Sequence, residues 1–254
     1  MKYEDPELDK VVIKVIGIGI AGNTAIKHMK DNALEGVEFH GFTKAKVDTL
    51  LKGSNLLFLI ADMSEDDVIE DFFSAAEKAK KLGILTISVV TITSSFDYIS
   101  RLTKVSDSLI LIQNKPANTI NDLQLDIVRC MSDAVTQQGM IGFDFADLKT
   151  ITKDVGLCAI GLGTGEGENR EDRAAQDAVS SLLSSNVNIF QQAYGVLVNI
   201  SAADMGISEF DAVGNIVHDL AADDVIVKIA TTHNQNLGDK IKVVIVVTGV
   251  HDIF

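Results

Sequence analysis

Tryptophan is absent from this chain of 254 residues, and only two prolines and two cysteines occur in it. Because the prolines stand at Pro6 and Pro116, no proline-rich linker separates the two halves of the chain. The cysteines, Cys130 and Cys158, lie far apart in the sequence and form no CxxC motif. A reducing compartment, the cytoplasm, is therefore the expected location of the protein.

Positive charge is also scarce, since 22 Lys and Arg residues face 36 Asp and Glu residues and the formal net charge is −14. Such an acidic chain is not expected to bind nucleic acid or an anionic membrane through a basic face. No apolar run reaches the length of a membrane span, and the first ten residues, MKYEDPELDK, are too charged for a secretory signal. We therefore expect neither nucleic acid nor a membrane as a partner.

The chain does contain enough apolar material for a sizeable core. Hydrophobic residues make up 46% of it and charged residues 23%, which is ordinary for a folded soluble protein. A chain of this length can form one large domain or two modest ones. No internal repeat or low-complexity tract is visible in the sequence.

The first half of the chain alternates buried strands with helices. Residues 11–19 read as a strand that enters a glycine turn, and residues 21–30 continue as a helix. Three further apolar runs, rich in Val, Ile and Leu, lie at residues 56–61, 84–92 and 108–113. This βαβα order predicts an α/β fold with a Rossmann-like, doubly wound parallel sheet.

A long helical pattern follows at residues 118–138, and we expect this helix to join two domains. The rest of the chain reads as α+β, with helices near 147–155, 171–183 and 209–221 and strands at 158–163, 195–201, 225–230 and 242–247. The expected organisation is a Rossmann-like domain at residues 1–116, a central connecting helix at 117–139 and a smaller α+β domain at 140–254.

Several motifs, in order along nearly the whole chain, are similar to those of one known family. They are IKVIGIGIAGNTAIKHM at 13–29, DFADLKTITKDVG at 144–156, GVLVNIS at 195–201 and LGDKIKVVIVVTGV at 237–250. These motifs resemble the tubulin/FtsZ family, and they are closer to FtsZ than to tubulin. The resemblance implies the tubulin/FtsZ fold, a cytoskeletal role in cell division, and filaments whose subunits bind and hydrolyse GTP.

The strand–turn–helix at residues 56–85 departs from this family at its signature, a glycine-rich phosphate loop. Seven residues, SEDDVIE from Ser64 to Glu70, stand where the family has GGGTGTG. Glycines let backbone N–H groups approach phosphate oxygens, whereas side chains block that approach. The new acids, Glu65, Asp66, Asp67 and Glu70, also add negative charge where a polyanion would lie.

A purely structural interpretation of the same turn is that Ser64 caps the helix with Asp67 three residues later. Acids in the first turn of a helix also complement its dipole. Both interpretations have the same consequence, because in each the helix start has filled its own anion site. We therefore predict that this turn does not hold a triphosphate.

Other positions of the family's nucleotide site are changed as well. The first glycine turn keeps three glycines, but a lone GxGxxG is weak evidence because a tight strand–helix turn needs it without any ligand. About forty family residues after Phe39 are missing, including another phosphate loop. The resemblance implies a degenerate nucleotide site at Gly17, Gly19, Gly22, Thr24, Asp97 and Asn121.

At this degenerate site, Asp97 takes the place of a ribose-contacting Glu and Asn121 that of a guanine-reading Asp. An Asn side chain offers only one acceptor oxygen with an amide donor beside it, so it cannot replace the Asp carboxylate. No cofactor is expected, and GTP or GDP would bind only if the site is functional despite these changes.

Two acids of a second family motif are retained. The motif NxDxxD reaches into the nucleotide site of the neighbouring subunit, and here it keeps Asp144 and Asp147 while Gly142 replaces its Asn. The resemblance thus implies a catalytic position for both acids, with a role that is vestigial or interfacial in this chain. The alternative is that Asp144 caps the next helix and Asp147 lies in its first turn.

Two other features carry no functional prediction. The glycine-rich run at residues 161–170 corresponds to a turn outside the family's nucleotide site, so we expect it to be structural. The five histidines show no metal-ligand spacing, and no Ser/His/Asp signature is present. We therefore expect no metal site.

Three functions are weighed against these features. The leading hypothesis is a pseudo-GTPase, a non-catalytic FtsZ-like protein that contacts itself or an FtsZ subunit and would cap a filament if only one face is intact. The alternative is a residual GTP-hydrolysing filament protein. A third class, an enzyme that uses NAD, would need Glu38 as its ribose-binding acid, but no catalytic constellation accompanies it. The resemblance also implies that the tail by which FtsZ binds membrane adaptors is missing after Phe254.

Overall fold

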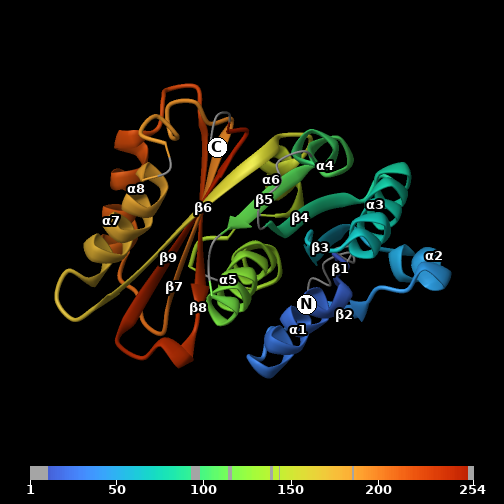
Figure 1. Ribbon diagram of the computed structural model, residues 1–254. Coiled ribbons are helices and arrows are strands. Elements are labelled where there is room, and N and C mark those ends of the chain that lie inside the picture. Colours follow the sequence, from blue (N-terminus) through green and yellow to red (C-terminus); the bar gives the residue numbers. More distant parts are fainter. Residues whose placement is uncertain are drawn as a thin grey trace, which may run out of the picture.

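The computed structural model describes residues 11–92, 98–113, 116–137, 140–142, 144–184 and 186–250. One sheet runs through the molecule, and helices pack on both of its faces (Figure 1). The first half alternates strands and helices as the sequence predicts. Its elements are β1 (Ile13–Ile18), α1 (Gly19–Asp31), β2 (Val37–Gly41), η1 (Lys44–Lys46), α2 (Val47–Leu51), β3 (Leu56–Asp62), α3 (Asp66–Lys81), β4 (Leu85–Ile92), α4 (Ile99–Val105) and β5 (Ser108–Gln113).

The second half begins with the long helix that the sequence predicts and continues as α+β. Its elements are α5 (Ala117–Thr136), α6 (Phe145–Thr152), β6 (Gly156–Glu166), α7 (Arg170–Leu183), β7 (Gly195–Ala202), α8 (Ile207–Leu220), β8 (Ile226–His233), η2 (Gln235–Leu237) and β9 (Lys240–Thr248).

The strand order in the sheet is β2-β1-β3-β4-β5-β6-β9-β7-β8. The strands from β2 to β6 are parallel, β9 is antiparallel to both β6 and β7, and β7 and β8 are parallel. The α/β class and the parallel first half are therefore confirmed. Because all strands from β1 to β5 point the same way, the turns that follow them lie along one edge of the sheet.

Two apolar clusters cover the two faces of the parallel half. On one face, Ile13 and Val15 of β1 pack with residues of α1 and α5, and on the other Ile16 and Ile18 pack with residues of α3 and α4. Helix α3 buries the stripe that its helical spacing predicts, namely Val68, Ile69, Phe72, Phe73, Ala76 and Ala79. A third cluster packs α7 and α8 on the sheet beside β7 and β9.

The segment between β2 and β3 is short and contains a helix that the sequence pattern does not indicate. Helix α2 has only five residues, too few to show a periodicity. The buried Lys14 of β1 holds it in place, because its Nζ donates to the carbonyl oxygens of Leu50 at 3.0 Å and Lys52 at 2.9 Å. The same ammonium lies 3.7 Å from the carboxylate of Glu38 on β2.

Candidate functional site

The turn between β1 and α1 is held together by backbone packing. A Cβ added at Gly17 would lie 2.3 Å from the carbonyl oxygen of Gly22, and one at Gly22 would lie 2.4 Å from the carbonyl oxygen of Ile60. Gly19 has a φ of +71°, in the left-handed region that favours glycine. The turn itself therefore requires all three glycines, whether or not a ligand binds.

The turn between β3 and α3 has a different cap from the one expected. Ser64 is not the N-cap of α3, which begins at Asp66 after an N-cap at Glu65 that makes no side-chain cap hydrogen bond. The backbone N–H of Ser64 instead donates to Oδ1 of Asp62 at 3.1 Å, so the Asp62 side chain organises this turn. The first-turn acids Asp66 and Asp67 do lie at the positive end of the helix dipole, as predicted.

These two turns touch each other where a phosphate chain would have to enter. Val68 of α3 is buried, and a Cβ added at Gly19 would lie 2.6 Å from its Cγ2. Ile20, which follows Gly19, is 83% exposed. The two turns line a depression between them, and Asp62, Glu65 and Val68 contribute side chains to it.

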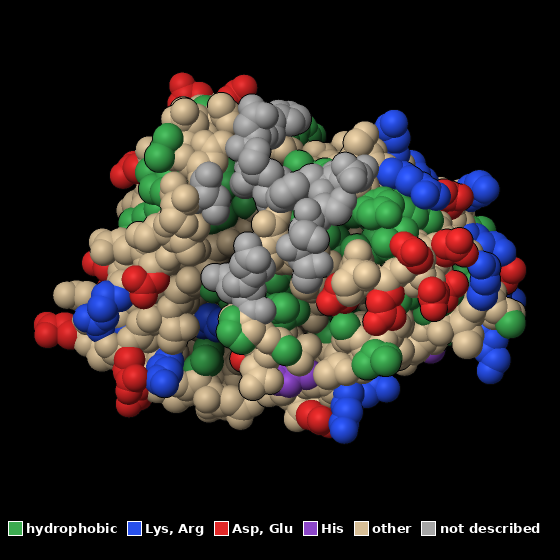
Figure 2. All heavy atoms as spheres, in the orientation of Figure 1, with side chains coloured by type: hydrophobic (Ala, Val, Ile, Leu, Met, Phe, Trp, Pro, Cys, Tyr) green, Lys and Arg blue, Asp and Glu red, His purple; other side chains and the backbone are tan. Residues whose placement is uncertain are grey.

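The acids of this edge face solvent without counter-charges. The four carboxylates of Glu65, Asp66, Asp67 and Glu70 belong to exposed residues, and none forms an ion pair within the part of the chain that the structure describes. Figure 2 shows acidic side chains gathered on the right of the visible face, with Lys and Arg side chains beyond them. An incoming polyanion would meet negative charge first at this edge.

The positions expected to face a nucleotide base lie on two helices that pack together. Thr24 of α1 is exposed, and its Oγ1 donates to the carbonyl oxygen of Ile20 at 2.9 Å. Asn121 is half-buried near the start of α5. The two helices are joined nearby by Nε2 of His28 and Oδ1 of Asp122, 2.9 Å apart. Asp97, the remaining expected site residue, lies outside the described residues.

The retained acids of the second motif both have structural roles. Asp144 is the N-cap of α6, with its Oδ1 accepting from the N–H of Asp147 at 2.8 Å, and Asp147 accepts in return from the N–H of Asp144 at 3.4 Å. Oδ1 of Asp147 also lies 2.7 Å from Nζ of Lys228 on β8. The hydrogen bond from Lys228 holds the pKa of Asp147 below its usual value, so this carboxylate is ionised and engaged at neutral pH.

The glycine-rich run at residues 161–170 is structural, as expected. Added Cβ atoms at Gly161, Gly163 and Gly165 would come within 2.2 Å of backbone oxygens of α7, so α7 lies directly on β6 at these positions. Arg170 at the start of α7 is anchored by Glu209 of α8, with Nε 2.7 Å from Oε1 and Nη2 3.2 Å from Oε2. At Gly161, Gly163 and Gly165 the backbone is therefore covered by α7 and not open to a ligand.

The described residues contain no group of three or more His, Cys, Asp and Glu side chains that could hold a metal ion. Cys130 and Cys158 are buried free thiols, and burial raises the pKa of Cys158 to about 11, which disfavours a reactive thiolate. Among the same residues, no helix is long and apolar enough to cross a membrane.

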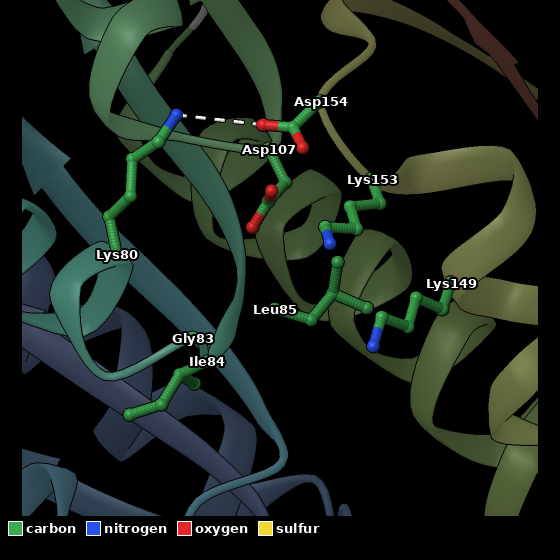
Figure 3. Close-up of a pocket in the computed structure, with 8 residues that line it drawn as sticks. All are labelled: Lys80, Gly83, Ile84, Leu85, Asp107, Lys149, Lys153 and Asp154. Atoms are coloured by element: carbon green, nitrogen blue, oxygen red, sulfur yellow. Dashed lines mark ion pairs between the residues drawn. The ribbon is translucent and has the colours of Figure 1, made fainter.

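A pocket at the opposite edge of the sheet was not indicated by the sequence, because its residues come from three separate segments of the chain. It is lined by Lys80 of α3, Lys149 of α6, Lys153, Asp107 and Asp154, with Gly83, Ile84 and Leu85 (Figure 3). The buried Asp107 side chain accepts from the N–H of Thr86 at 2.7 Å, and burial raises the pKa of Asp107.

Comparison with protein families and curated proteins gives one consistent result. Residues 156–251 match the model of the FtsZ family, C-terminal domain. The cell division protein FtsZ of Pseudomonas aeruginosa is 31% identical over 304 residues, which covers 94% of this chain and 77% of that protein. FtsZ of Coxiella burnetii is 32% identical and is matched over 93% of this chain and 78% of its own length. The first alignment is longer than the chain itself, so that relative carries segments that this chain lacks.

Solved structures share the fold. An empty FtsZ dimer of M. jannaschii superposes with a TM-score of 0.86 at 22% identity, covering 95% of this chain and 89% of that one. CetZ2 of Haloferax volcanii, in a GTPγS-bound protofilament, superposes with a TM-score of 0.64 at 11% identity, covering 95% and 94%. At these identities the structural likeness establishes the fold and nothing more.

Proposed function

This chain belongs to the FtsZ family, and from that membership we propose that it is an FtsZ-like cell-division protein that acts by contact between subunits and not by GTP turnover. In this proposal it is a pseudo-GTPase. It associates with itself, with an FtsZ subunit, or with both.

The observation that carries the proposal is the contact of Val68 with Gly19 where the two turns meet, beside an acidic depression. Val68 fills the space beside Gly19, and the neighbouring Glu65 and Asp66 present carboxylates to solvent. A phosphate site at a helix start needs free backbone N–H groups within reach and a favourable local potential. We expect both conditions to be poorly met here, because Val68 packs against Gly19 and the carboxylates repel a polyanion.

The second part of the proposal is that the loop before α6 still docks onto a subunit that binds nucleotide. Its support is that Asp144 and Met140 are exposed and that Ile141 and Asp144 are each held by hydrogen bonds. The capping box fixes α6, and the N–H of Thr231 on β8 donates to the carbonyl oxygen of Ile141 at 2.7 Å. A subunit with a docking loop at one end and a closed site at the other would stop filament growth, so it would act as a cap.

Sedimentation of an FtsZ assembled with GTP tests this capping role. We expect the protein to shorten the filaments and lower the pelleted fraction at amounts well below one per FtsZ subunit. The variant D144S/D147Q keeps a capping box but removes both carboxylates, so its effect on sedimentation should be much weaker while its α6 stays folded. An undiminished effect of this variant would show that these acids take no part in docking.

The alternative is a residual GTP-binding and GTP-hydrolysing filament protein. The retained Gly17, Gly19 and Gly22 favour it, since the first turn keeps its backbone shape. It predicts GTP turnover per subunit that rises with protein concentration, because hydrolysis in such filaments needs two subunits. Our proposal predicts no turnover above the background at any protein concentration.

A further inference from the structure

The sheet has an open lateral edge at strand β2. This strand is the outermost one at its end of the sheet, and within the described residues it pairs only with β1 (Figure 1). The chain passes from β2 to β3 through residues 42–55, which form η1 and α2 and no further strand. Because an edge strand presents unpaired N–H and C=O groups, it is a template on which another strand can add.

The backbone geometry decides which residues of β2 face outward. The N–H of Phe42 donates to the carbonyl oxygen of Gly17 on β1 at 2.9 Å, which continues the ladder between the two strands. Since a strand alternates with a period of two, the even-numbered residues of β2 direct their backbone groups at β1. The odd-numbered residues Val37, Phe39 and Gly41 direct theirs outward, where they have no backbone partner in the part of the chain that the structure describes.

The sequence of β2 is complementary to itself in the antiparallel direction. A twofold axis at Phe39 pairs this residue with its own copy and Val37 with Gly41, so the outward residues of both strands exchange their hydrogen bonds. The same register sets Glu38 directly opposite His40 of the second copy, on both sides of the axis. These are non-hydrogen-bonded pairs, in which the side chains lie closest, and a carboxylate accepts readily from an imidazole N–H.

The side chains of β2 are available for this pairing. Glu38 is exposed, and Phe39 and His40 are half-buried. Within one copy the Glu38 carboxylate lies 3.7 Å from Nζ of the buried Lys14, so two such carboxylates arrive at the axis with their counter-charges. On the opposite face of the sheet, Nζ of Lys30 lies 5.6 Å from the centre of the Phe39 ring. The register places this ring next to its copy, and an aromatic pair of that kind stabilises a strand pair.

We propose that two copies of the chain join by antiparallel pairing of their β2 strands, with Glu38 of each copy against His40 of the other. The contact is isologous, so it closes as a dimer in which one sheet continues across both copies. It uses neither the glycine turn after β1 nor the loop before α6. The inference therefore goes beyond the proposed function and stands whether or not GTP binds. Because one short strand pair buries little surface, we expect a reversible dimer that forms in the micromolar range of protein concentration.

Sedimentation equilibrium of charge-swapped variants without nucleotide tests this pairing. E38K sets an ammonium against His40, and H40E sets two carboxylates against each other. Each variant alone should therefore form a dimer that is about tenfold weaker than that of the wild type. In an equimolar mixture the introduced ammonium meets the introduced carboxylate, and the remaining His40 meets the remaining Glu38. The mixture should recover a dimer of about wild-type affinity.

Matched controls separate this contact from net charge and from the loop before α6. D177K and Q176E make the same charge changes at exposed positions of α7, and both should dimerise as the wild type does. D144S/D147Q should also dimerise normally. A wild type that stays monomeric, a mixture that does not recover, or α7 controls that lose as much would overturn the inference. Dimers that are lost in D144S/D147Q but ignore the charge swap would overturn this inference and leave the proposed function intact.

Hydrogen exchange of the wild type gives a second measurement that needs no variant. It is required because E38K leaves the ammonium of Lys14 without its carboxylate, which by itself can loosen β2. In the wild type, the amide groups of Val37, Phe39 and Gly41 should exchange more slowly at high protein concentration than at low concentration. Peptides of α7 should exchange equally at both concentrations. Equal exchange of β2 at concentrations where dimers sediment would show that the copies meet elsewhere, and the inference would be wrong.

Discussion

At the scale of single residues, Gly17 and Gly22 show that a glycine motif can be required by the packing of its own turn. An added Cβ at either position would lie within 2.4 Å of a carbonyl oxygen, so the turn needs both glycines whether or not a phosphate binds. The proposed loss of the phosphate site rests instead on neighbouring positions, where the chain has Ile20 and the side chains of Ser64 to Glu70.

The close approach of α7 to β6 can be tested at Gly163. Its substitution by Ala places a Cβ about 1.9 Å from the carbonyl oxygen of Ala174, so α7 must move away from the sheet. We expect Gly163→Ala to lower the free energy of unfolding by about 2–4 kcal/mol in chemical denaturation. Gly142→Ala is the control, because an added Cβ there meets nothing within 4 Å, and it should change stability by less than about 0.5 kcal/mol.

Asp133 of α5 should make the stability depend on pH. The side chain is buried, and burial raises its pKa to about 6, against smaller opposing effects of Arg129 and of the hydrogen bond from Gln137. The folded state therefore binds this proton more tightly than the unfolded state, and the unfolding free energy falls as the pH rises from about 4 to about 7.

Asp133→Asn removes this titration, so its unfolding free energy should vary less over that pH range, by on the order of 2–3 kcal/mol. Asp147 and Glu209 act in the opposite direction. Their pKa values are lowered, so their contributions are lost as the pH falls below about 4. Denaturation curves at several pH values would measure the difference, and parallel pH profiles for the two proteins would contradict this role of Asp133.

At the scale of helices and strands, periodicity predicted most elements and missed those set by single side chains. The buried stripe of α3 and the length of α5 follow from apolar spacing, and both are confirmed. The predicted N-cap of α3 was wrong. The N-cap is Glu65 and not Ser64, and the backbone N–H of Ser64 donates to the side chain of Asp62. Helix α2 was not predicted because it depends on a distant residue, Lys14, and the lysine pocket was not predicted because three separate segments converge on it.

The short segment around α2 should depend on Lys14. Lys14→Met keeps the apolar stem but leaves the carbonyl oxygens of Leu50 and Lys52 without their donor, so we expect a loss of about 1–3 kcal/mol in unfolding free energy. Hydrogen exchange should rise first in α2. Lys27→Met, at an exposed position of α1, is the control and should leave both measurements unchanged.

At the scale of the whole molecule, the two halves of the sheet are joined narrowly. Strands β5 and β6 share three residue pairs, from Ser108–Gly156 to Ile110–Cys158, whereas β6 and β9 share nine. Helix α5 strengthens this junction, because Leu197 of β7 and Val246 of β9 belong to the same apolar cluster as Val128 and Met131 of α5. We propose that residues 1–116 and 140–254 are separate folding units that share this helix.

Fragments test that division. A fragment of residues 117–254 retains α5 over the apolar face of β7 and β9, so it should unfold cooperatively. A fragment of residues 140–254 exposes that face, and we expect it to bind a hydrophobic dye and to aggregate. Equal stability of the two fragments in thermal unfolding would contradict a shared helix.

We propose that this FtsZ-family chain does not use GTP, and calorimetric titration with GTP and with GDP in the presence of Mg²⁺ tests this proposal. With Val68 against Gly19 and carboxylates at the start of α3, we expect no saturable heat up to about 1 mM nucleotide. A dissociation constant in the low micromolar range would show that the acidic turn is part of a functional nucleotide site, and the pseudo-GTPase proposal would then be wrong.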